Sequence, residues 1–132
     1  MKMRVGLVLA VLALDLGTKW AMYDPDLLNQ RLGADAWRMP FYAVVLGIFI
    51  AGLLLARGVA GIAFALILGG YLGQMSQLLA TGSVSDWLAV GGYWTNVADI
   101  AVAAGCALLV LEYGRYVARE LAPLRTVGHH ES

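Results

Sequence analysis

The chain has 132 residues, of which 61% are hydrophobic and 14% charged, and its mean hydropathy is +0.74. A soluble domain of this length could not bury so much apolar surface, so we expect lipid to be the solvent for most of the chain. Nine basic and nine acidic residues cancel, which excludes a bulk charge that would draw the protein to nucleic acid.

Charges and turn residues separate four apolar stretches, which are Val5 to Met22, Phe41 to Ala56, Val59 to Ala80 and Trp94 to Tyr113. At about 1.5 Å rise per residue, each can cross or nearly cross a hydrocarbon core of about 30 Å. The second stretch is the shortest, and we expect it to extend through Pro40. The sequence therefore predicts an all-α integral membrane protein with four transmembrane helices and short outer loops. One domain, residues 1–122, precedes a polar cytoplasmic tail, residues 123–132.

The connection between the second and third stretches sets the orientation of the chain. Only Ala56, Arg57 and Gly58 join them, so these two helices must form an antiparallel hairpin. The amino terminus, this turn and the carboxyl tail then share one side of the membrane. Most of the basic residues lie on that side, namely Lys2, Arg4, Arg57, Arg115, Arg119 and Arg125. By the positive-inside rule, we expect both termini in the cytoplasm and the two longer loops outside.

The amino-terminal stretch also fits a cleavable signal peptide, because Lys2 and Arg4 precede an apolar run. That run continues through Asp15 to Trp20 without a clean small-residue cleavage site. We therefore expect a retained first helix.

Cysteine and histidine usage restricts the chemistry. Cys106 is the only cysteine and lies in an apolar run, so we expect a small packed side chain and no internal disulfide. His129 and His130 are neighbours in the polar tail, and the chain has no HExxH pattern. The sequence therefore does not support a zinc peptidase.

Asp15 lies ten residues into the first stretch, and Lys19 follows one turn further outward on the same helix face. A charge inside a membrane helix costs several kcal/mol unless it is paired, protonated or hydrated. We therefore expect an ion pair in which Lys19 extends toward the outer interface. This spacing favours a structural role for Asp15 over a direct chemical one.

Asp86 follows the outward end of the third stretch, and Asp99 lies near the start of the fourth. Topology puts both on the outer side of the membrane, where they can face each other across one hairpin. Two close carboxylates can share a proton, so one can activate water while the other protonates the leaving nitrogen. That is the chemistry of an aspartyl protease. In the structural alternative, Asp86 caps a loop and Asp99 bonds to Asn96 or a neighbouring helix.

Three segments resemble the sequence boxes of the lipoprotein signal peptidase family, also called signal peptidase II. Asp15-Leu16-Gly17-Thr18-Lys19 resembles the family's D-x-x-[ST]-K box. Ser83-Val84-Ser85-Asp86-Trp87 resembles the box with one catalytic aspartate, and Thr95-Asn96-Val97-Ala98-Asp99 resembles the F-N-x-A-D box with the other. The order and topology of these segments agree with those of the family over most of residues 5–113. The combination is therefore more specific than any single box.

This resemblance implies an aspartic endopeptidase of the bacterial inner membrane, with its active site toward the outer face. It implies cleavage of prolipoproteins just before a diacylglyceryl-modified cysteine, in contact with membrane lipids, and without a metal, an organic cofactor or a nucleic acid partner. Asp86 and Asp99 would be catalytic. Asn96 would orient a carboxylate or the substrate backbone, and Asp15, Lys19 and Gln74 would support the site.

The chain departs from the family in its glycine-rich box. Where the family has G-N-x-x-D-R, this chain reads Gly73-Gln74-Met75-Ser76-Gln77-Leu78, so both members of a charged pair are absent. Losing both charges leaves no single charge unpaired in the membrane. The segment Arg31 to Trp37 matches the family's N-x-G-A-A-F box poorly, and both outer loops are short. The resemblance therefore implies a divergent or shortened member.

Three alternatives remain open at the level of sequence. One is a catalytically inactive or retargeted relative that binds lipoproteins without cutting them. Another is a small proton-coupled transporter that uses Asp15 or Asp99. A third is a serine peptidase in which Lys19 activates Ser83 or Ser85, although pairing with Asp15 would keep that lysine protonated.

Overall fold

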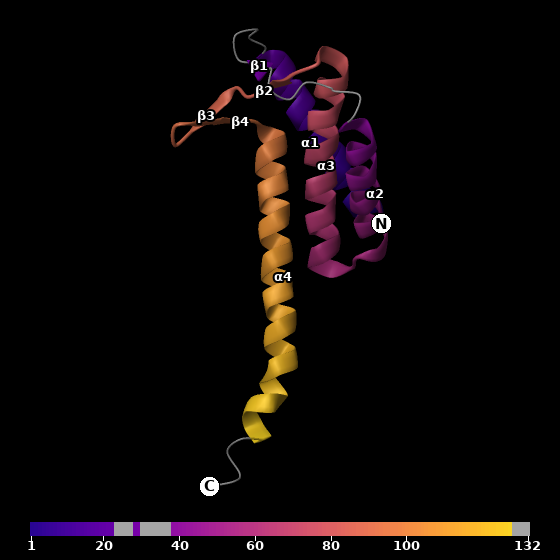
Figure 1. Cartoon of the computed structure of the whole chain (residues 1–132), viewed down its shortest axis with the longest axis vertical. Coiled ribbons are helices and arrows are strands. Elements are labelled where there is room, and N and C mark those ends of the chain that lie inside the picture. The colour runs from indigo at the N-terminus through magenta and orange to yellow at the C-terminus, as the bar shows by residue number, and fades with distance from the viewer. Residues whose placement is uncertain (23–27, 30–37, 128–132) are drawn as a thin grey trace.

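The computed structural model describes residues 1–22, 28–29 and 38–127, with side chains for 1–22 and 38–121. Its helices are α1 (Lys2–Ala21), α2 (Met39–Leu55), α3 (Gly58–Thr81) and α4 (Val97–Val127). Two short antiparallel ribbons lie at one end of the helices (Figure 1): β1 (Leu28–Asn29) pairs with β2 (Val84–Ser85), and β3 (Leu88–Val90) with β4 (Tyr93–Thr95). The chain is therefore mostly helical, and the ribbons add strands that the sequence did not predict.

The four helices lie over the four apolar stretches, and α4 differs most from its predicted range. It starts at Val97, because Trp94 and Thr95 belong to β4. It continues to Val127, past the predicted end of the span at Tyr113, because arginine, glutamate and alanine favour helix although they are not all apolar. At 1.5 Å per residue, its 31 residues extend about 46 Å.

Helix α3 is the centre of the bundle and contacts α1, α2 and α4 (Figure 1). Small residues permit this close packing. A Cβ on Gly70 would meet the Ala98 carbonyl of α4, and one on Gly69 would meet Val11 of α1. Small residues thus lie at helix contacts along α3, whereas Gly47 on α2 faces open space.

The turn between α2 and α3 is the tight hairpin that the sequence predicted. Gly58 adopts a left-handed backbone conformation with φ +56°, which glycine tolerates without strain. Arg4 at the start of α1 donates from Nη1 to the carbonyl oxygens of Leu53, at 2.8 Å, and Ala56, at 2.5 Å. These bonds satisfy carbonyls at the end of α2 and hold the amino terminus beside the hairpin turn.

The outer surface of the bundle is apolar, and the buried core is small. Val8, Leu53, Ala65 and Leu68 form the core cluster. Large apolar side chains on all four helices are exposed instead, among them Leu9, Leu14, Phe41, Ile48, Leu54, Leu79, Ile100 and Leu111. Cys106 is also exposed, so the prediction of a packed cysteine was wrong: on α4 it is the neighbouring Gly105 that lies against Ile67 of α3.

Within the described residues, two helices are long and apolar enough to cross a membrane, Gly58–Thr81 and Val97–Leu121. Helix α2 is apolar but shorter, with 17 residues. Helix α1 has 20 residues and carries Lys2, Arg4, Asp15 and Lys19 among its apolar ones. These features are those of a helical membrane protein whose apolar surface faces lipid.

Candidate active site

The start of α4 is fixed by Asn96, and this helix end organises the polar cluster. The Asn96 carbonyl oxygen accepts the first helical bond from the Ile100 N–H at 3.3 Å. Its side-chain Oδ1 accepts the Asp99 N–H at 3.0 Å. Asn96 is therefore the N-cap of α4, a position that asparagine favours because its short amide reaches the first free N–H groups.

Asp15 on α1 caps the same helix end from the side. Its Oδ1 accepts the Ala98 N–H at 2.9 Å, and its Oδ2 bonds to Lys19 Nζ at 2.7 Å. The Asp15 carboxylate is fully buried, and Gly73 of α3 lies so close to it that a Cβ there would clash with Oδ2. A carboxylate at a helix N-terminus is stabilised by the free N–H groups and the helix dipole.

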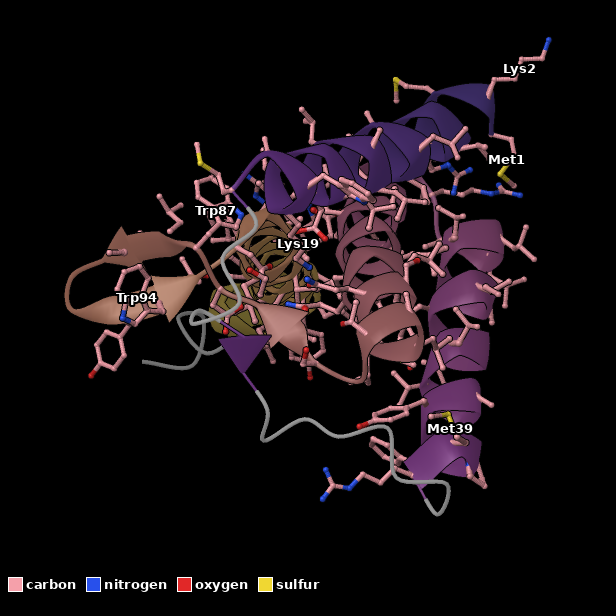
Figure 2. All side chains as sticks on the ribbon, turned by 90° about the horizontal axis from the view of Figure 1, so that it is seen from above. Met1, Lys2, Lys19, Met39, Trp87 and Trp94 are labelled. Atoms are coloured by element: carbon pink, nitrogen blue, oxygen red, sulfur yellow. The ribbon has the colours of Figure 1, made fainter. Side chains whose placement is uncertain are left out.

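The predicted ion pair of Asp15 with Lys19 is confirmed, but Lys19 does not extend toward the outer interface. Its side chain is 3% exposed, and Figure 2 shows it inside the bundle, whereas Lys2 points away from the protein. Lys19 is buried because it bonds at 2.7 Å to Asp15, whose side chain packs against Gly73 of α3 and the start of α4. The described bonds of Lys19 do not include Ser83 or Ser85, so this geometry does not support the serine peptidase alternative.

Asp86 and Asp99 are linked through Asn96, although thirteen positions separate them in the sequence. Asn96 Nδ2 donates to Asp86 Oδ1 at 2.6 Å, while Asn96 Oδ1 accepts the backbone N–H of Asp99. Gln74 of α3 donates from Nε2 to Asp99 Oδ1 at 2.7 Å and to Asn96 Oδ1 at 3.2 Å. The hydroxyl of Thr95 donates to Asp99 Oδ2 at 3.2 Å.

The structure thus brings together every residue that the sequence proposed for the site. Asp86, Asn96, Asp99 and Gln74 form one hydrogen-bonded cluster, and Asp15 with Lys19 holds the helix end behind it. Asp99 also bonds to Asn96 and to a neighbouring helix, as the structural alternative predicted. The catalytic roles of these residues therefore stay predictions.

Two further members of the cluster were missed at the level of sequence. In the sequence, Gln77 is notable only because it replaces a charged residue of the family's box. In the structure, its Oε1 accepts the Ser85 N–H at 2.9 Å. Its spacing of three from Gln74 could have indicated a shared helix face. Thr95 binds Asp99 directly, and an Asn with an acidic residue three positions later is a capping pattern that points to this helix start.

Three buried polar atoms of this region have no hydrogen-bond partner among the described residues: Gln74 Oε1, Ser85 Oγ and Trp87 Nε1. Buried polar groups are normally hydrogen-bonded, so three unpaired polar atoms around one cluster mark a place where a polar ligand can bind. Within the same residues, no group of three or more histidine, cysteine, aspartate or glutamate side chains could hold a metal ion. His129, His130 and the segment 31–37 lie outside the described part of the chain.

A groove of about 500 Å³ opens between α1 and α3 beside this cluster. Leu16, Trp20 and Ala80 form apolar walls, and Lys19 and Gln77 lie at the polar side. The groove therefore offers an apolar surface next to Lys19 and Gln77.

Fold and site together define a helical membrane protein with two aspartates joined through one asparagine side chain at one end of its bundle. Residues 26–115 match the family model of signal peptidase II. The chain belongs to the signal peptidase II family.

Curated relatives agree with this assignment. The chain is 31% identical to the lipoprotein signal peptidase of Salmonella newport over 140 aligned positions, which cover 80% of this chain and 84% of the relative. The corresponding protein of Salmonella typhi is 29% identical with the same coverage. The lipoprotein signal peptidase of Pasteurella multocida is 39% identical over 93 residues, which span 59% of this chain and about half, 54%, of that relative.

Solved structures support the fold. Two structures described as bacterial membrane enzymes match with TM-scores of 0.77 and 0.64. The first covers 90% of this chain and 92% of its own at 17% identity, and the second 86% and 93% at 20% identity. The helical arrangement is therefore that of known membrane enzymes, despite low sequence identity.

Proposed function

We propose that this chain is a lipoprotein signal peptidase and that Asp86 and Asp99 are its catalytic aspartates. The observation that carries the proposal is the amide of Asn96, which donates to the Asp86 carboxylate at 2.6 Å and accepts the Asp99 N–H at 3.0 Å. One side chain thus hydrogen-bonds to both acidic residues. Family membership supports the reaction class, and this arrangement supports the choice of residues.

The chemistry is that of a carboxylate pair that shares one proton. The ionised carboxylate takes a proton from water as that water attacks the scissile carbonyl, and the protonated partner stabilises the developing oxyanion. The same acid then protonates the departing nitrogen. Gln74 and Thr95 hold the two oxygens of Asp99 in fixed directions, which reduces the reorganisation needed during the reaction.

The substrate class that we propose is a prolipoprotein with a diacylglyceryl-modified cysteine. An apolar signal segment and acyl chains would reach the site through lipid, and the groove between α1 and α3 provides apolar walls beside the cluster. The unpaired Gln74 Oε1 can accept a backbone N–H of the bound peptide. The names of the bacterial relatives support this substrate class.

For topology, we propose four membrane spans, both termini in the cytoplasm, and a site at the outer face of the inner membrane. Arg4 binds the end of α2 beside Arg57, which gathers positive charge at the helix ends opposite the carboxylate cluster. Such a charge distribution favours the cytoplasm for that end. The cluster then lies at the outer interface, where water can enter.

Cleavage of a diacylglyceryl-modified prolipoprotein by the purified full-length protein tests the proposal, with Asp99→Asn as the matched variant. We expect cleavage by the native protein and none by the variant at equal folded concentration. A folded native protein that binds the substrate without cutting it would instead identify a non-cutting lipoprotein-binding protein. Proton-dependent flux in vesicles without cleavage would identify the transporter alternative.

A further inference from the structure

Gln77 and Leu78 stand where the family's box carries a charged pair, and the two side chains are almost completely buried, with exposures of 9% and 4%. Leu78 needs no polar partner. Gln77 has a specific one, because its Oε1 accepts the Ser85 N–H at 2.9 Å in a buried bond. A neutral amide thus makes a hydrogen bond at this position without the second charge that a buried carboxylate would require.

Ser85 is the residue directly before Asp86, and both sides of its backbone are held. Its N–H is bound by Gln77 of α3, and its carbonyl oxygen accepts Asn96 Nδ2 of the α4 cap at 3.4 Å. Because Ser85 is fully buried, water cannot reach its N–H or its carbonyl oxygen to replace either hydrogen bond. The direction in which the chain leaves Ser85 determines where the Asp86 side chain starts.

Gln74 and Gln77 therefore each hold one of the two acidic segments. They lie three positions apart on α3, so their side chains share a helix face. Gln74 holds the Asp99 carboxylate directly, and Gln77 holds the peptide that carries Asp86. Helix α3 contacts both acidic segments through these two uncharged amides.

We infer that Gln77 is a positioning residue for Asp86, and that its amide oxygen does this by fixing the Ser85 peptide. The inference rests on the proposed function, because it assigns a role toward one of the proposed catalytic aspartates. A packing role alone would need only the volume of the side chain. The positioning role needs an acceptor oxygen at the reach of a glutamine.

Two substitutions separate these roles. Gln77→Met keeps the length and volume of the side chain but removes the acceptor. Leu79→Met is the matched control, because Leu79 lies two residues further on α3 with a 63% exposed side chain. Each full-length protein is purified in detergent, its folded concentration is measured, and kcat and KM for the lipidated prolipoprotein are determined separately.

We expect Gln77→Met to lower kcat by about ten- to a hundredfold, as loss of one hydrogen bond that orients a reacting group does, and to leave KM within about threefold. Leu79→Met should match the native kcat. A kcat for Gln77→Met within about twofold of native overturns the inference. Equal losses in Gln77→Met and Leu79→Met also overturn it, because the loss would then not depend on the acceptor at position 77.

Amide hydrogen exchange at Ser85 tests the bond independently of cleavage. We expect exchange of the Ser85 amide to be at least about tenfold faster in Gln77→Met than in the native protein and Leu79→Met, because the N–H loses its buried partner. Unchanged Ser85 exchange overturns the inference. If the native protein does not cleave, the proposed function fails, and this measurement still decides whether Gln77 fixes the Ser85 peptide.

Discussion

The Asp15 carboxylate on α1 accepts the backbone N–H of Ala98 on α4 at 2.9 Å, across 83 positions of sequence. This bond ties the first helix to the first turn of the last one, where Asn96 and Asp99 lie. The other carboxylate oxygen of Asp15 binds Lys19. One buried side chain therefore pairs with a charge and also sets the position of the helix end that carries the site.

Asp15→Asn should reduce the free energy of unfolding by about 3 kcal/mol or more, because it leaves the buried Lys19 without its counter-charge. The asparagine can still accept the Ala98 N–H, so the loss reports mainly on the ion pair. Thermal or denaturant unfolding in detergent measures the effect. Lys19→Met should cost less, because the Asp15 carboxylate keeps the N-terminus of α4 as a favourable partner.

The double variant Asp15→Asn with Lys19→Met completes this cycle. It leaves neither charge unpaired, so we expect it to be more stable than Asp15→Asn alone. Additive losses in the double variant would show that the two side chains do not act as a pair.

Gly73→Ala should destabilise the protein by about 1 to 3 kcal/mol and reduce cleavage, because the new methyl group would push the Asp15 carboxylate away from Ala98. Gly47→Ala is the matched control: it lies inside α2 with open space around it, and alanine there should be neutral or slightly stabilising. Melting temperatures of the two variants measured together check the prediction. Equal effects at both glycines would contradict the close packing around Asp15.

Asn96→Ser should separate helix capping from the proposed catalytic support. Serine is a good N-cap, so we expect the stability to change by less than about 1 kcal/mol. Its short hydroxyl cannot also reach Asp86, so kcat should fall by about ten- to a hundredfold through loss of a hydrogen bond to a reacting carboxyl group. Native kcat in a stably folded Asn96→Ser protein would show that the bond from Asn96 to Asp86 is dispensable.

Asp86→Asn and Asp99→Asn should each reduce cleavage by about a thousandfold or more, because each removes one partner of the shared proton while keeping the shape of the side chain. Both variants should fold, since asparagine can still accept the bonds from Asn96, Gln74 and Thr95. Product formation at matched folded concentrations is the measurement. Retained cleavage in either variant would remove that aspartate from the mechanism.

Hydrophobicity and charge in the sequence were enough to predict the helical membrane fold and the position of most helices. They located the hairpin at Arg57 and the start of α2 near Pro40, because a short turn and a proline leave few alternatives. They did not predict the far end of α4 or the short ribbons. Hydropathy marks where a chain can contact lipid, whereas the end of a helix depends on local propensity and capping.

The residues of the candidate site were also predicted from sequence, because charged and amide side chains in an apolar chain need an explanation and their boxes are specific in combination. Spacing alone could predict the local ion pair of Asp15 with Lys19, since the two lie one turn apart on a single helix. The length of Lys19 suggested that it would extend outward, and burial between helices decided otherwise.

Only the tertiary structure decided how distant segments contact one another. The bonds from Asp15 to Ala98, from Gln74 to Asp99 and from Gln77 to Ser85 each join separate elements. Their geometry depends on how closely the helices approach, which the glycines of α3 permit but do not specify by spacing. The sequence by itself determined which polar groups must be satisfied within the membrane. The packing of α1 and α4 against α3 decided which partners satisfy them, because hydrogen bonds form only between groups that the fold brings within reach.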